Sequence, residues 1–322
     1  MKSLIFLTIF LLNLLNANNN LIDIYRTQGI KALETKIDTI LTEKSYWDQY
    51  LQNIDVSNGY YESIQYILKC SKELNQIEIY QYNNKKNNLI YKSDIITGKH
   101  DGQKNIEGDL KTPIGVYTLR KKLTKLDPFY GPLALVTTYP NNFDKSYGKT
   151  GSGIWIHGFP KSKKRKPYTK GCIALKNKNL LQLDQCIDFK KSILIIEDKP
   201  GDTTVSKNDI SIILSQIFLW KEAWKSNNLE KYLSFYSDEF KKSNQSNLQD
   251  FIAYKTRIFA KNEQKEIQFS KINITPYPNY LGKTMFKINL FEQYHTKWYQ
   301  FIGYKDIYIE LINDKIKILN EG

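Results

Sequence analysis

Two short stretches decide how this chain is interpreted: Ile154-Trp155-Ile156-His157-Gly158 and, after a basic loop, Thr169-Lys170-Gly171-Cys172-Ile173. The first reads as an apolar strand that ends in histidine, and the second as a glycine turn that opens on cysteine. A cysteine attacks as its thiolate, and a neighbouring imidazole can take the thiol proton. We therefore expect both side chains at one rim of a sheet. A sharp turn at Gly171 would let the amides of Gly171 and Cys172 face a developing oxyanion.

The rest of the sequence offers no competing centre. The other two histidines, His100 and His295, lack comparable surroundings, and the scattered His and Cys have no zinc-ligand spacing. Gly148-Lys149-Thr150 does not continue a phosphate-binding loop, because Phe143 stands where that motif needs glycine. We expect neither a metal nor a cofactor. From spacing alone, a catalytic Cys–His pair and two structural residues both remain open.

The two stretches resemble the signature of the YkuD-type L,D-transpeptidase family. That signature is a histidine–glycine pair, a loop, serine or threonine, any residue, glycine, cysteine and a hydrophobic residue. Three upstream runs also resemble family segments in the family's order: Gly108–Tyr117, Tyr139–Asn141 and Gly148–Gly151. The resemblance covers residues 74–199.

The resemblance implies a role for each matching residue. Cys172 would attack the carbonyl at the L-centre of meso-diaminopimelate in a peptidoglycan stem and expel the terminal D-Ala. His157 would be general base and then acid, and the Gly158 carbonyl would orient its imidazole. The amides of Gly171 and Cys172 would form the oxyanion hole.

The substrate would be bound by Thr169, Lys170, Trp155 and Tyr139. One position departs from the family, since many members carry Arg or Asn two residues after the cysteine and this chain has Ala174. That loss argues against efficient cross-linking, unless another basic residue substitutes. Lys170 and the cluster Lys161–Lys166 are available for this. The cluster is either a lid that attracts carboxylates or a solvated loop.

The N-terminus predicts export. We expect residues 1–17 to be a signal peptide, with a positive start, an apolar run over Ser3–Leu15 and the small Ala17 at the cleavage point. An uncleaved N-terminal anchor is the alternative. The mature protein is then periplasmic. The full sequence has a formal charge of +14, which in an exported protein suits a membrane or an acidic polymer rather than nucleic acid, or reflects a composition rich in lysine. An odd cysteine count leaves at least one thiol unpaired. Cys70 and Cys186 form either a bridge or two buried free thiols.

The expected fold class is α+β multidomain. A helical N-terminal segment over 18–72 shows apolar residues at three- and four-residue steps, with Tyr60, Ile64, Ile67 and Leu68 on one face of its last part, and suggests a homodimer surface. A mixed, largely antiparallel β-sheet catalytic domain follows over 74–199. Residues 205–322 begin with helices and continue as strands, and they resemble the NTF2-like fold.

NTF2-like domains often enclose a pocket, so we expect either a small-molecule or glycan ligand there or a cone filled by Trp220, Trp224 and Tyr236. The whole layout is similar to the cell-shape L,D-carboxypeptidases of helical Gram-negative bacteria, which trim peptidoglycan tetrapeptides to tripeptides. Our hypothesis is this hydrolysis, through a Cys acyl-enzyme. The alternatives are an L,D-transpeptidase that forms 3-3 cross-links or attaches proteins to peptidoglycan, and a glycan-binding wall protein. A protein-cleaving thiol protease ranks last, because no papain-like or caspase-like motif surrounds Cys172.

Overall fold

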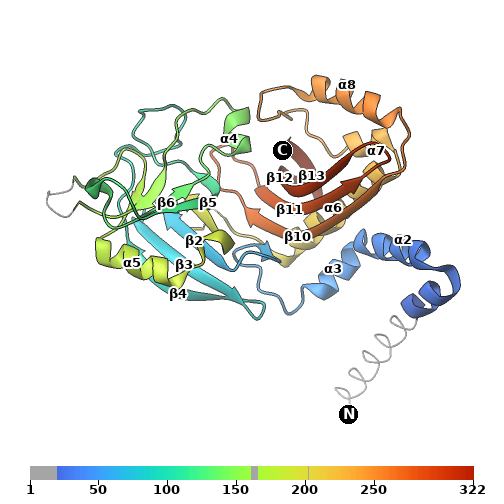
Figure 1. Cartoon of the computed structure of the whole chain (residues 1–322), viewed down its shortest axis with the longest axis horizontal. Helices are drawn as coiled ribbons and strands as arrows, with labels where there is room; N and C mark the ends of the chain where they lie inside the picture. The colour runs from blue at the N-terminus through green and yellow to red at the C-terminus, as the bar shows by residue number, and fades with distance from the viewer. Residues whose placement is uncertain (1–19, 161–165, 202) are drawn as a thin grey trace, which may run out of the picture.

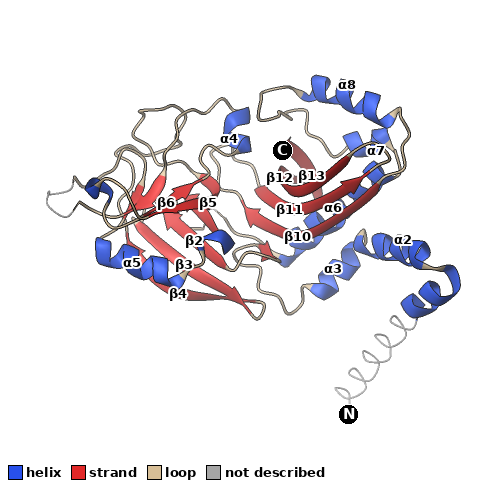
Figure 2. Ribbon diagram, viewed as in Figure 1, coloured by secondary structure: helices blue, strands red, loops and turns tan. Residues whose placement is uncertain are grey.

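Figure 1 shows a computed structural model in which residues 20–160, 166–201 and 203–322 are described. The predicted signal peptide, residues 1–17, lies outside these ranges. The chain builds two sheets, one of eight strands in the order β4-β3-β2-β9-β5-β6-β7-β8 and one of five in the order β1-β10-β11-β12-β13 (Figure 2). The strands are β1 (Tyr60–Tyr61), β2 (Tyr66–Ser71), β3 (Gln76–Asn83), β4 (Lys86–Asp94), β5 (Gly115–Leu123), β6 (Ala134–Thr137), β7 (Trp155–His157), β8 (Ile173–Ala174), β9 (Ser192–Glu197), β10 (Glu266–Pro276), β11 (Met285–His295), β12 (Gln300–Ile312) and β13 (Lys315–Glu321).

Helices flank both sheets. Residues 20–28 are helical, and two short 3-10 turns, Pro128–Tyr130 and Phe189–Lys191, lie in the catalytic half. The α-helices that follow are α2 (Ile30–Leu41), α3 (Lys44–Tyr50), α4 (Asn142–Ser146), α5 (Asn177–Cys186), α6 (Lys207–Lys225), α7 (Leu229–Leu233) and α8 (Leu248–Phe259). The α+β class and its three-part layout are as expected.

The eight-stranded sheet is mixed. Strand β2 pairs with β9 in parallel, as β7 does with β8, and the remaining neighbours are antiparallel. Its central strand β9 is buried along its whole length. Because successive side chains of a strand point to opposite faces, Leu194 and Ile196 enter one core while Ile193 and Ile195 enter another.

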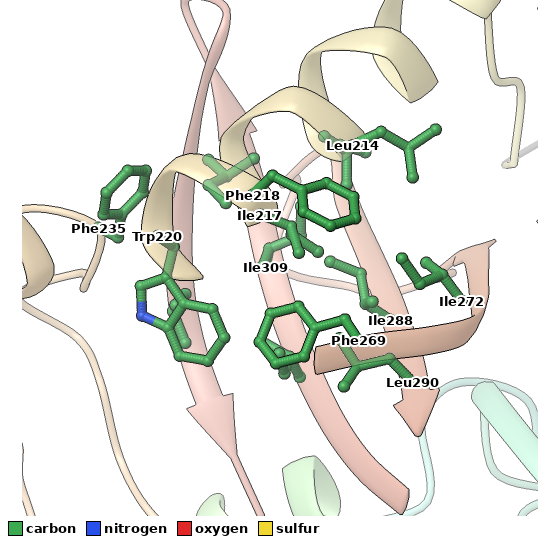
Figure 3. Close-up of a cluster of buried hydrophobic side chains, with 14 of the residues drawn as sticks. Leu214, Ile217, Phe218, Trp220, Phe235, Phe269, Ile272, Ile288, Leu290 and Ile309 are labelled. Carbon is green, nitrogen blue, oxygen red and sulfur yellow. The ribbon is translucent and has the colours of Figure 1, made fainter. Parts of the chain in front are cut away.

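The five-stranded sheet wraps around α6. Figure 3 shows Phe218 and Trp220 of this helix against Phe269 and Leu290 of the strands, in one apolar cluster. The aromatic residues named from the sequence are core residues: Trp220, Trp224 and Tyr236 are all buried here. Trp224 also forms part of a cavity wall, described below.

A third apolar cluster joins the two halves. Ile193 and Ile195 of β9 pack with Val116 of β5 against Tyr308 of β12 and Leu319 of β13. The C-terminal domain therefore covers one face of the catalytic sheet.

The N-terminal segment is only partly helical, so the prediction for 18–72 is wrong in its second half. Tyr60 lies in β1 and pairs with Ile274 of β10, whereas Ile67 and Leu68 lie in β2 beside β9, and Ile64 lies between these strands. Apolar residues at short spacing fit a buried strand as well as a helix face. Here, pairing with distant strands decides the outcome.

A tight turn joins the last two strands. Strand β12 continues without interruption from Gln300 to Ile312. The turn comes at Asn313 and Asp314, whose φ angles are 47° and 59°, a left-handed conformation that these residue types tolerate. Helix α8 was not expected.

Candidate active site

Strands β7 and β8 bring Cys172 and His157 to one face of the sheet. Ile156 pairs with Ile173 in parallel register, and both are fully buried in the catalytic core. His157 follows Ile156 and Cys172 precedes Ile173. The alternation of a strand therefore directs both side chains to the opposite face.

The ring of His157 is held from two sides. Its Nδ1 lies 2.7 Å from the carbonyl oxygen of Gly158. A carbonyl only accepts hydrogen bonds, so Nδ1 carries the hydrogen and Nε2 is the nitrogen that can accept a thiol proton. Tyr130 packs edge-on against the imidazole at 5.0 Å between ring centroids, and His157 is buried. The contact to Gly158 is the one that the family resemblance implies.

The nucleophile loop is shaped by Gly171 and Thr169. Gly171 has φ +131°, and a Cβ there would lie 2.7 Å from the Lys111 carbonyl oxygen. The Thr169 hydroxyl donates to the Cys172 carbonyl oxygen at 2.7 Å and accepts from the Gly171 N–H at 2.9 Å. The Cys172 thiol in turn lies 3.4 Å from the Gly153 carbonyl oxygen.

These bonds bear on two expectations. The Gly171 N–H is engaged by the Thr169 hydroxyl in this structure, and the oxyanion-hole roles of the Gly171 and Cys172 amides stay predictions. Thr169 is buried and shapes the loop. Its direct contact with substrate stays a prediction.

The other predicted substrate residues fall in different environments. Lys170 is exposed, and Trp155 is half-buried with its ring 5.1 Å from that of Tyr130. Tyr139 is buried in the catalytic core, and its hydroxyl donates to the Thr150 carbonyl oxygen at 3.1 Å. Its contact with substrate stays a prediction.

Basic and aromatic side chains lie beside the nucleophile loop. Thr169 N–H donates to the Thr97 carbonyl oxygen at 2.7 Å, which brings the following Lys99 close to the loop. The ammonium groups of Lys99 and Lys166 lie 5.7 and 5.8 Å from the Tyr168 ring centroid. The rest of the Lys161–Lys166 cluster lies outside the described residues.

The departure at Ala174 is part of the buried sheet. Ala174 is fully buried, and it exchanges two backbone hydrogen bonds with Ile96, each 2.9 Å long. All three cysteines are free thiols, with Cys70 buried and Cys172 and Cys186 half-buried. No Cys70–Cys186 bridge is formed.

Two residues beside His157, Tyr130 and Asn177, are not among those predicted from the sequence. Tyr130 contacts both Trp155 and His157, and Asn177 binds the backbone just after Gly158. Neither lies in the quoted stretches, although Asn177 follows Cys172 by five positions and could have been considered as an adjoining polar residue.

The C-terminal domain encloses a cavity of about 590 Å³. Its lining includes the aromatic residues Trp224 and Tyr294 and the charged residues Lys255, Lys305 and Glu321. Burial lowers the pKa of Lys255 to about 8, because its ammonium is removed from water.

The charges in this cavity are unevenly matched. Lys305 pairs with Glu292 at 3.0 Å. Lys255 forms no ion pair with any described residue, and its Nζ lies 5.1 Å from the Trp224 ring centroid.

Two features are absent from the described ranges. No helix there combines the length and apolar character needed to cross a membrane. His, Cys, Asp and Glu residues in those ranges form no group of three able to hold a metal ion.

Comparison with known proteins places both halves. Residues 66–205 match the YkuD L,D-transpeptidase catalytic domain, and residues 212–322 match the Cds6 C-terminal NTF2-like domain. No curated protein matches.

Three solved structures resemble nearly the whole chain. The helical cell shape determining protein Pgp2 from Campylobacter jejuni is 41% identical, with 87% of this chain and 99% of that chain covered and a TM-score of 0.82. A point mutant of the same protein is 40% identical, with 88% of this chain and 99% of that chain covered and a TM-score of 0.84. Bd1075 from Bdellovibrio bacteriovorus is 27% identical, with 84% of this chain and 97% of that chain covered and a TM-score of 0.65. The matches confirm the resemblance first seen around His157 and Cys172. The chain thus belongs to the family of peptidoglycan-acting, cysteine-type YkuD proteins with an NTF2-like C-terminal domain that includes the cell-shape determinant Pgp2.

Proposed function

We propose that this protein is a periplasmic L,D-carboxypeptidase that trims peptidoglycan tetrapeptide stems to tripeptides. The observation that carries the proposal is the placement of Cys172 on the same sheet face as His157, whose Nδ1 donates to Gly158. This arrangement supplies a nucleophile and an oriented base, as thiol acyl transfer requires.

The reaction would proceed in two balanced halves. The Cys172 thiolate bonds to the carbonyl carbon at the L-centre of meso-diaminopimelate, and the Cys172 amide stabilises the oxyanion. The C–N bond to D-Ala then breaks, and the imidazolium of His157 protonates the leaving amine. In the second half His157 takes a proton from water, whose oxygen attacks the thioester. The tripeptide leaves with a new carboxylate, and the thiol is restored.

Hydrolysis is favoured over transpeptidation by Ala174. Where many family members present Arg or Asn, this chain has a methyl group within a buried strand. We infer that the site binds a second stem, the acceptor in transpeptidation, only weakly, and that water hydrolyses the acyl-enzyme instead. Formation of 3-3 cross-links is the alternative outcome of the test below.

The test uses purified disaccharide-tetrapeptide and mass spectrometry of the products. Loss of one D-Ala is expected with the mature protein and with Cys186→Ala, a control that removes the other half-buried thiol. Cys172→Ala should abolish the loss. Dimers with a 3-3 bond would move the assignment to transpeptidase, and an unchanged substrate would contradict both enzymatic proposals and favour a glycan-binding protein.

We also propose that the C-terminal cavity binds a carboxylate-bearing peptidoglycan fragment. Lys255 is buried and forms no ion pair with any described residue, and it sits among aromatic rings that suit the faces of a sugar or peptide. An anionic group would supply the missing partner. Calorimetric titration with the tripeptide fragment should show binding that Lys255→Met removes, and equal affinity of the variant would refute this.

The N-terminal helices are proposed as a homodimer surface. Ile22, Tyr25 and Ile30 are exposed on them. Helix α2 is fixed to the C-terminal domain through Asp38, which pairs with Lys221 of α6 at 2.6 Å. The segment up to Ser71 also contributes β1 and β2 to the two sheets, so this surface is tested by substitution rather than by deleting the segment.

A further inference from the structure

The peptide unit that orients His157 is itself held by a side chain. This unit consists of the Gly158 carbonyl and the Phe159 N–H. The carbonyl accepts from His157 Nδ1 at 2.7 Å, and the N–H donates to Asn177 Oδ1, also at 2.7 Å. Asn177 Nδ2 donates in return to the Phe159 carbonyl oxygen at 3.0 Å. One amide side chain thus grips the backbone on both sides of Phe159.

We propose that Asn177 is a positioning residue that fixes the orientation and tautomer of His157 through the Gly158–Phe159 peptide. The inference rests on the proposed thiol chemistry of Cys172 and His157. Hydrogen bonds in a chain polarise one another, so an acceptor on the Phe159 N–H strengthens the Gly158 carbonyl as acceptor for Nδ1. Nε2 is then kept as the nitrogen that takes the thiol proton.

The packing around Asn177 leaves the peptide little freedom. A Cβ on Gly158 would lie 2.2 Å from Asn177 Oδ1, and a Cβ on Gly131 would lie 2.5 Å from the same atom. The Gly158 N–H donates to the Tyr130 carbonyl oxygen at 2.8 Å. Both glycines are therefore needed for the close approach of the amide, which explains two residue types that the chemistry alone does not require.

Asn177 also links the base to the nucleophile along the chain. It opens α5, whose preceding strand β8 directly follows Cys172. The Leu175 N–H donates to the His157 carbonyl oxygen at 3.0 Å. The segment 172–177 thus carries the thiol of Cys172 at one end and, at the other end, the Asn177 side chain that binds the backbone after His157. A displacement of this segment would therefore move both the nucleophile and the residue that positions the base.

The test measures alkylation of Cys172 by iodoacetamide between pH 5 and 9, quantified by mass spectrometry of the Cys172 peptide. Asn177→Leu removes both hydrogen bonds, and Asn177→Asp keeps the acceptor for Phe159 N–H. We expect Asn177→Leu to move the half-maximal rate upward by at least one pH unit, because the thiolate loses its oriented imidazole partner. Asn177→Asp also loses the donor to the Phe159 carbonyl oxygen, so its profile should lie between those of the wild type and Asn177→Leu. The matched control is Asn179→Leu, on the same helix, which loses one hydrogen bond to Ser93 and should leave the profile unchanged.

Turnover of the tetrapeptide separates this inference from the proposed function. A positioning role predicts that kcat falls about 10- to 100-fold in Asn177→Leu with little change in KM. Should Asn177→Leu not fold, Asn177→Ser, which is too short to reach Phe159, replaces it with the same expectation. Wild-type alkylation and turnover in the folded variant would overturn the proposal while leaving the enzyme assignment intact. A shifted alkylation profile in the variant, together with no tetrapeptide cleavage by the wild-type protein, would uphold the positioning role and refute the carboxypeptidase.

Discussion

Replacing Thr169 by valine removes one hydroxyl and keeps the shape of the side chain. That hydroxyl donates to the Cys172 carbonyl and accepts from the Gly171 N–H, at 2.7 and 2.9 Å, inside a buried loop. Each buried group left without a partner costs roughly 1–3 kcal/mol. We therefore expect the free energy of unfolding to fall by about 2–4 kcal/mol, measured by urea denaturation followed through tryptophan fluorescence.

The same substitution should act on catalysis through the loop that carries the thiol. Displacement of a nucleophile by a fraction of an ångström lowers turnover steeply, so we expect kcat on disaccharide-tetrapeptide to fall about 100-fold with KM nearly unchanged. Thr203→Val is the matched control. It removes a buried hydroxyl bonded to Glu197 at 3.0 Å and should lower stability without lowering kcat of the folded enzyme.

Two results would refute this reasoning. A raised KM with an unchanged kcat would show that Thr169 contacts the substrate, as the family resemblance implies, and does not hold the loop. A variant with wild-type stability and turnover would show that water replaces the hydroxyl without cost.

Three further perturbations test other parts of the molecule. Lys255→Met should be more stable than wild type at pH 7. The folded-state pKa of Lys255, about 8, lies below the unfolded value of about 10.4, so the unfolded chain binds more protons between these values and wild-type stability rises there. The difference in free energy of unfolding between Lys255→Met and the wild type should shrink between pH 8 and 10 in urea titrations. A difference that stays constant over this range would contradict a lowered pKa for Lys255. Asp38→Asn breaks a buried pair with Lys221 and should cost about 3 kcal/mol at pH 7. Burial raises the pKa of the Asp38 carboxyl, but Lys221 and Lys225 of α6 lower it by more, so the pKa in the folded protein lies below the ordinary value. The stability lost in Asp38→Asn should therefore vanish as acid protonates the wild-type carboxyl. Unfolding at pH 7 and at pH 3 measures this. Ile22→Ser with Tyr25→Ser should convert a dimer to a monomer in light scattering, and equal masses would end the dimer proposal.

Most of the candidate active site could be predicted from the local sequence signature. His157, Gly158 and Cys172 could be named because the family's chemistry is written in two short runs, and the two runs form adjacent strands. Roles for Tyr130 and Asn177 could not be predicted, because their contacts with the segment around His157 form only when the 3-10 turn Pro128–Tyr130, strand β7 and helix α5 come together. Their residue types alone carry no instruction to bind there.

Errors in the sequence-based prediction have the same origin. Tyr60 and Ile67 have apolar neighbours at helical spacing, but their strand partners, Ile274 and Ile193, lie more than one hundred residues away. The packing of the Tyr139 ring on Tyr117 in the core is likewise a contact that its place in a family run does not indicate. A local sequence pattern contains no information about contacts with residues that lie far away in the sequence.

Strand β9, buried on both faces, has a consequence for how the enzyme would work on a polymer. Its two rows of isoleucine and leucine bind the catalytic core on one side and the C-terminal domain on the other. The cavity and the thiol are thereby mounted on one continuous block. An enzyme that held one stem in the cavity while it cleaved another would keep the two stems at a fixed separation.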